Sequence, residues 1–114
     1  MSIAVALTAL PAEIARFGAR AFLVTNSTER PPHVASVHVA VRGSELEMRV
    51  GRTARANAIA NAAVTVMWTA EPEAEYCLIG DGTAHEGSTE AFVVVPTSAV
   101  LHRLAPRVPT DDSR

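Results

Sequence analysis

The sequence predicts a small antiparallel β-barrel, mainly β-structure with short helices, and three observations support this fold class. Six short segments show the alternating or continuous apolar pattern of strands. The segments between them are short, and three helices at most fit among them. No glycine-rich turn of the kind that binds a dinucleotide follows a strand. The pattern therefore favours a small barrel over a parallel sheet, which would need longer helices between most strands.

Three short helices are predicted, over residues 8–18, 53–61 and 97–106. In the first, Pro11 falls in the opening turn and Gly18 is placed to end the helix. The candidate capping residues are Thr8 for the first helix, Thr53 for the second, and Thr97 or Ser98 for the third.

The predicted strands cover residues 19–26, 33–41, 46–50, 63–68, 76–87 and 89–96. Val37 and Val39 alternate with polar or small residues in the second of these, so one face of that strand is expected to be drier. The second and third strands are predicted to form a hairpin around Gly43. We expect a bulge in the fifth strand near Gly80 and Gly82.

The composition of the chain fits one domain of 114 residues with 48% hydrophobic content. We assign residues 1–104 to this domain and residues 105–114 to a flexible tail. A net charge of −2 argues against a general nucleic-acid binder, and no apolar run approaches the ~20 residues of a membrane span. The lone Cys77 and the lack of a secretory signal predict a reducing, cytoplasmic setting.

A basic segment, GRTARAN at residues 51–57, begins the second predicted helix. A helix start offers unpaired N–H groups and a partial positive charge, which favour an anion. Arg52 and Arg55 add planar groups suited to phosphate, and Thr53 adds a hydroxyl. The alternative is a capped surface helix whose arginines are solvated, in a chain that uses arginine for all ten of its cations.

Several pieces of the chain, taken in order, resemble the pyridoxamine 5′-phosphate oxidase-like, FMN-binding split-barrel family in a short form. The pieces are AFLVT, PHVASVHV, ELEMRVGRTARANAIANAAVTVMW, YCLIGDGTA and PTSAVLHRLAP, and they span about residues 8–104. The resemblance implies a split β-barrel that forms a homodimer, with flavin in a groove at the dimer interface.

The resemblance also implies where the flavin would lie. Its phosphate would be held at residues 51–57 and its ring would lie along PHVASVHV, residues 32–39. Two departures from the family pattern bear on the phosphate: Ala54 stands where a lysine is usual, and Gly51 replaces a threonine. Phosphate binding is therefore expected at Arg52 or Arg55 if it is kept.

Further candidates for cofactor binding are Ser36, Val37 and His38 on the second predicted strand, and Trp68. Ser36 and His38 share a face and could donate hydrogen bonds to a flavin edge; the alternative is the polar outer face of an edge strand. Trp68 could stack on a ring, although core or interface packing is the simpler interpretation.

The remaining histidines and the cysteine predict no metal site. His33, His38, His85 and His102 show no zinc-ligand spacing, and Cys77 is interpreted as a small buried residue. His102 and Arg103 are expected to end the last helix, where cations suit the helix dipole; the alternative is that they reach the partner's flavin groove. No catalytic residue is assigned.

The sequence therefore predicts a flavin-dependent oxidoreductase that acts on a small-molecule redox substrate. The resemblance implies FMN or the deazaflavin coenzyme F-420 as the cofactor, and the sequence does not separate the two, because the negative tail of either would favour arginines. The alternative is a non-catalytic module that binds or stores a flavin, a haem or a tetrapyrrole.

Overall fold

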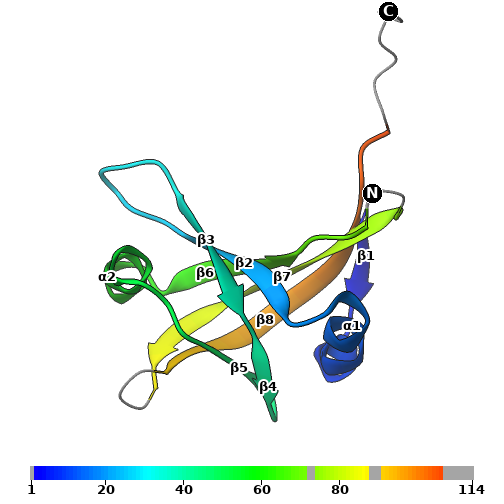
Figure 1. The fold of residues 1–114 in the computed structure, drawn as a ribbon, viewed down its shortest axis with the longest axis horizontal. Coiled ribbons are helices and arrows are strands. Elements are labelled where there is room, and N and C mark those ends of the chain that lie inside the picture. The colour runs from blue at the N-terminus through cyan, green and yellow to red at the C-terminus, as the bar shows by residue number, and fades with distance from the viewer. Residues whose placement is uncertain (1, 72–73, 88–90, 107–114) are drawn as a thin grey trace, which may run out of the picture.

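The structure, a computed structural model, describes residues 2–71, 74–87 and 91–106. The strands in these ranges form one eight-stranded antiparallel sheet that curls into a half-barrel flanked by short helices (Figure 1). This arrangement confirms the predicted mainly β, split-barrel fold class. The strands are β1 (Ser2–Val5), β2 (Arg20–Thr25), β3 (His33–His38), β4 (Ala40–Arg42), β5 (Glu45–Met48), β6 (Ala63–Trp68), β7 (Tyr76–Glu86) and β8 (Phe92–Arg103). The helices are the 3-10 helix η1 (Leu7–Ala9), α1 (Leu10–Phe17) and α2 (Arg52–Ala60).

The strand order along the sheet is β3-β2-β6-β7-β8-β5-β4, and β1 also pairs with β8. The two strands at the ends of this order, β3 and β4, are separated in the chain by Val39 alone. The predicted continuous strand over residues 33–41 is therefore wrong in one respect. Its first part pairs with β2, and only Ala40–Arg42 forms the predicted hairpin with β5. One stretch of chain thus bridges the two open ends of the sheet.

The core is a single cluster of apolar side chains on the inner face of the curled sheet. Leu23, Val66 and Leu78 from neighbouring strands are 0% exposed, as alternation along each strand requires. Leu10 and Ile14 of α1 join the same cluster. The helix therefore contributes to the core through two apolar residues one turn apart.

Two of the three predicted helices are present, α1 and α2, and both begin without the predicted side-chain caps. Neither α1 nor α2 has a side-chain cap hydrogen bond. Helix α1 follows the 3-10 turn that contains Thr8 and ends at Gly18, where φ is 102°, a backbone conformation that favours glycine. In α2 the capping position is Gly51, whose carbonyl accepts a hydrogen bond from the Arg55 N–H at 3.1 Å. Thr53 instead lies inside the first turn.

The predicted C-terminal helix is wrong, because residues 97–103 continue strand β8. This segment pairs with β7 on one edge and, over Ala99–His102, with β1 on the other. The prediction missed β1, so it left the segment without a strand partner on that side. Hydrogen bonding to two strands outweighs the weak local helix preference of residues 97–106.

The irregularity predicted near Gly80 and Gly82 is present, since the β7–β8 register shifts between Asp81 and Gly82. The extra residue, however, is Thr97 of β8, because Asp81 pairs with Ser98 and Gly82 with Pro96. Gly82 faces Pro96, which lacks an N–H and is tolerated within a sheet mainly at edges and bulges. A Cβ atom at Gly82 would lie 2.7 Å from Val94 Cγ1 and 2.7 Å from the Val95 carbonyl oxygen. Glycine is therefore required by close approach of β8.

Among the described residues, no helix is long and apolar enough to cross a membrane. Of the predicted tail, residues 107–114 lie outside the described residues.

Candidate functional site

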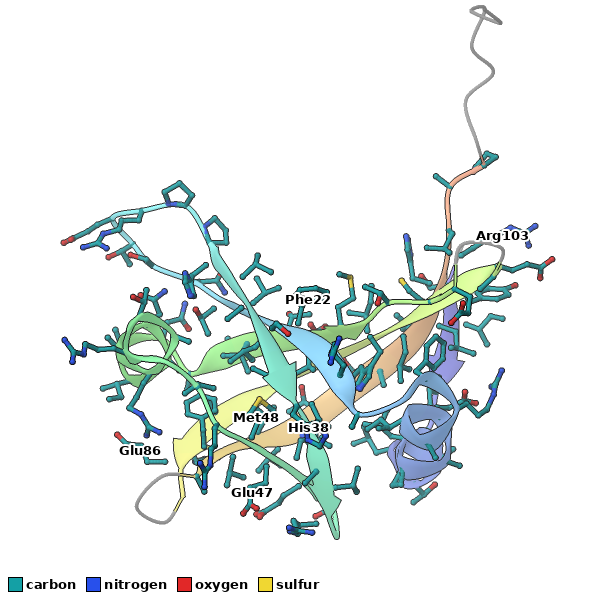
Figure 2. The ribbon with its side chains drawn as sticks, in the orientation of Figure 1. Phe22, His38, Glu47, Met48, Glu86 and Arg103 are labelled. Carbon is teal, nitrogen blue, oxygen red and sulfur yellow. The ribbon has the colours of Figure 1, made fainter. Side chains whose placement is uncertain are left out.

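A groove of about 630 Å³ lies where β3 passes into β4. Three of the predicted site residues, Ser36, Val37 and His38, line it together with residues of β5 and the segment after it. In Figure 2, His38 on the strand that crosses the front of the sheet lies beside Met48 of β5. The full lining is Arg20, Ser36, Val37, His38, Ala40, Glu47, Met48, Arg49 and Ala91. The three residues of β3 that the sequence predicts as cofactor-binding therefore lie together in one groove.

Strand β3 offers an open edge to this groove. It pairs with β2 on one side, and no strand among the described residues pairs with its other side. Backbone N–H and C=O groups of every second residue therefore point away from the sheet, as on any edge strand. Val37 is buried, whereas Ser36 and His38 are exposed. The groove consequently combines alternating backbone donors and acceptors with two polar side chains.

The charges in the groove are mainly positive. Among the described residues that line it, Arg20 and Arg49 are cations and Glu47 is the only carboxylate. That carboxylate lies 3.5 Å from Arg42 Nε, so part of its charge is offset by a cation outside the groove lining. A concave surface with an excess of one sign concentrates ions of the opposite sign. The groove is therefore suited to a ligand that carries an anionic group.

Arg55, from the predicted phosphate site, already has a partner. Its Nη1 lies 3.2 Å from Glu86 Oε1, and its guanidinium carbon lies 5.8 Å from the centre of the Phe92 ring. The Arg55 side chain is 26% exposed and that of Glu86 56%. An exposed ion pair of this kind contributes only about 0–1 kcal/mol to stability. An incoming phosphate could therefore replace the Glu86 carboxylate as the partner of Arg55.

Arg52 and Thr53 are exposed in the first turn of α2 and do not line the groove. Only Val50 and Gly51 separate Arg52 from Arg49, which does line it. Three residues of extended chain span at most ~10 Å. A ligand with its ring on β3 and a flexible anionic tail could therefore reach the start of α2.

Trp68 lies in the core and is 0% exposed. Its Nε1 atom is buried and has no hydrogen-bond partner among the residues that the structure describes. This position agrees with the packing interpretation of Trp68. In a single chain, neither face of the indole ring is accessible for stacking on a ligand.

The other residues considered lie away from the groove. His102 and Arg103 are at the far end of β8, where His102 Nδ1 is 3.4 Å from Ser2 Oγ and Arg103 lies over the Tyr76 ring. Figure 2 shows Arg103 and Glu86 at opposite ends of the sheet. Because the segment is a strand, the predicted helix-dipole role of these cations does not apply.

Cys77 is buried, as predicted. His33 is half-buried at the start of β3, and His85 is exposed near the end of β7. The described residues contain no group of three side chains able to hold a metal ion.

Sequence reasoning missed Arg20 as a site residue. Arg20 lies in a segment that is predicted as an apolar strand, and no feature of the neighbouring sequence identifies it as a site residue. The signal lies in the strand pairing, because Arg20 is the direct cross-strand partner of His38, and residues opposite each other project from the same face.

No protein-family model matches the chain, and no curated protein matches it. Several solved structures are similar to it, among them the following three. The "FAD binding protein from Mycobacterium smegmatis" is 18% identical, with a TM-score of 0.66 over 90% of this chain and 99% of that one. A putative pyridoxamine 5′-phosphate oxidase from Listeria innocua is 14% identical, with a TM-score of 0.65 over 81% and 97%. An "F420 Reductase" is 20% identical, with a TM-score of 0.58 over 70% and 87%.

These likenesses extend over most of each chain, although few residues are identical. They agree with the curled antiparallel sheet described above. The chain therefore has the split-barrel fold of the pyridoxamine 5′-phosphate oxidase-like proteins.

Proposed function

We propose that this protein is a flavin-dependent oxidoreductase that uses FMN or a deazaflavin and acts on a small molecule. The observation that carries the proposal is the groove along the open edge of β3, lined by Ser36, Val37 and His38. Support comes from the fold, which is similar to that of proteins described as binding FAD or as reducing F420.

The groove fits a flavin in size and in chemistry. Its volume of about 630 Å³ lies within the ~300–1,000 Å³ typical of small-molecule sites. One edge of a flavin ring system carries alternating acceptors and a donor, which the open edge of β3 can match. The excess of positive charge in the groove suits the anionic tail.

When bound, the flavin would supply the redox chemistry, that is, transfer of a hydride or of electrons. The chain itself would bind and orient the ring. The backbone of β3 and the Ser36 hydroxyl would offer hydrogen bonds to the ring edge, and the His38 imidazole could hold or release a proton beside it. Arg52 and Arg55 would hold the phosphate at the start of α2.

A homodimer is part of the proposal, because the groove of a single chain is open on its outer side. The outer face of the sheet carries an apolar row that begins next to the groove. Its members are directly paired across four strands and all partly exposed: Phe22, Met67, Ile79 and Val100. Phe22 is itself the cross-strand partner of Ser36. A second copy packed on this row would both bury it and cover the groove.

Titration of the purified protein with FMN and with the deazaflavin tests the proposal. We expect one of them to bind with a change in its absorption band, and the band to bleach when a reduced nicotinamide is added without oxygen. A bound flavin whose band never responds to reductants would favour the storage module instead. No binding of either cofactor would contradict the proposal.

A further inference from the structure

Arg20 and His38 form a pair of basic side chains at one end of the groove. We propose that this pair is a binding site for a phosphate or carboxylate group, separate from the start of α2. The site shares the groove with the proposed flavin, and it rests on the proposed function only for the identity of the ligand, because free phosphate would be enough to occupy it.

Strand pairing holds the two side chains together. Arg20 is the first residue of β2, and its Cα partner is His38, the last residue of β3. Side chains at directly opposed positions lie on the same face, with Cβ atoms ~4.5–5.5 Å apart. The pairing on β2 and β3 therefore presents both groups to one ligand without any rearrangement of the backbone.

Neither side chain is occupied elsewhere. Within residues 2–71, 74–87 and 91–106, neither Arg20 nor His38 makes a side-chain hydrogen bond or an ion pair, and both residues are exposed. Arg16, which lies four residues earlier, differs in this respect, because it is bound to Glu13 at 2.6 Å. The Arg20 guanidinium thus keeps a planar set of donors that matches the oxygens of a phosphate or carboxylate.

The surroundings favour an anion over a cation. The whole chain has a net charge of −2. Among the described residues that line the groove, Glu47 is the only carboxylate, and Arg42 lies 3.5 Å from it and offsets part of its charge. An anion between Arg20 and His38 would meet donors on both sides.

The anionic group could belong to the phosphate of the flavin or to a substrate. The chemistry at Arg20 is the same in both cases. The two sources differ in whether loss of Arg20 weakens the binding of FMN, which has a phosphate, relative to riboflavin, which lacks one.

Inorganic phosphate is the probe for the site. We would titrate it into the protein without flavin, at constant pH and ionic strength, and follow the imidazole signals of His38 by NMR. We expect a saturable shift in the parent protein, binding at least about tenfold weaker in Arg20→Gln, and retained binding in Arg20→Lys. Arg16→Gln is the matched control and should behave as the parent.

If phosphate does not shift the His38 imidazole signals of the parent protein, the proposed site is overturned. Equal phosphate affinity in the parent and in Arg20→Gln would overturn it as well. If the site exists, weaker binding of FMN but not of riboflavin to Arg20→Gln assigns it to the cofactor phosphate, and unchanged binding of both assigns it to a substrate. Failure of the parent to bind any flavin, with the phosphate response intact, would remove the proposed function and leave the anion site standing.

Discussion

At the scale of single residues, the tightest steric requirement is in β7, opposite the bulge of β8. Gly80 and Gly82 lie two residues apart on this strand, and both are buried. Gly82 faces the backbone of β8 so closely that no Cβ fits, whereas a Cβ at Gly80 would meet Trp68 Cζ3 at 3.8 Å, an ordinary contact. The same substitution should thus have opposite consequences at the two positions.

We expect Gly82→Ala to lower the free energy of unfolding by about 1–3 kcal/mol, because the new methyl group overpacks the contact with Val94 and Val95. Gly80→Ala should change it little or raise it slightly, since alanine has less backbone freedom in the unfolded chain. Urea unfolding followed by Trp68 fluorescence measures both. Equal stability of the two variants would contradict the close approach of β8 at Gly82.

At the scale of elements, a buried hydrogen bond holds α2 against the barrel. The first turn of the helix remains accessible to a ligand. Asn57 donates a hydrogen bond from Nδ2 to Thr25 Oγ1 at 3.1 Å, and Thr25 is 0% exposed. Loss of a bond to a buried hydroxyl costs about 1–3 kcal/mol. The exposed Arg55–Glu86 pair contributes about 0–1 kcal/mol. The buried bond therefore positions the helix, and the surface pair can open without loss of the fold.

The start of α2 gives a prediction about FMN. Changing Arg52 and Arg55 together to Ala should weaken FMN binding a hundredfold or more, because each hydrogen bond to a charged group contributes about 1.5–3 kcal/mol. Glu86→Gln should strengthen it several-fold, because Arg55 loses its competing partner. Riboflavin should bind all three proteins equally in fluorescence titrations. Unchanged FMN affinity in the double variant would mean that these arginines are only a solvated helix start.

At the scale of the whole molecule, the apolar row on the outer face calls for a partner. Phe22, Met67 and Ile79 are neighbours through strand pairing and are only partly covered. Val34, one strand further, is 57% exposed. A contiguous apolar patch on one face of a sheet is typical of an interface.

Met67→Glu should therefore abolish the homodimer, because it places a charge in the middle of the row, and it should weaken flavin binding in parallel. Sedimentation at micromolar concentration would give the mass of two chains for the parent and of one for the variant. Ala12→Glu, a charge added on the exposed side of α1, is the control. A parent protein that sediments as one chain would contradict the proposal that a second copy covers the flavin groove.

The sequence predicted the elements whose patterns are local. The bulge near Gly82, the strands around the core and helix α2 follow from alternation, spacing and glycine positions. The errors at residues 97–103 and at Val39 have another cause, since both depend on which strands become neighbours. The pairing of Arg20 with His38 belongs to the same class, because one sequence without its partners does not reveal the register of two strands.

Strand β8 is the last strand among the described residues, and three other strands pair with it. β7, β5 and β1 all hydrogen-bond to β8, and Ser2 of β1 is paired with His102. During synthesis, β7 and β5 have one unpaired edge and β1 has two until residues 92–103 emerge from the ribosome. Unpaired strand edges are the surfaces through which incomplete chains aggregate. A nascent chain is therefore most prone to aggregate before residues 92–103 have been made, and a stop codon before Phe92 should yield insoluble product rather than a shortened barrel.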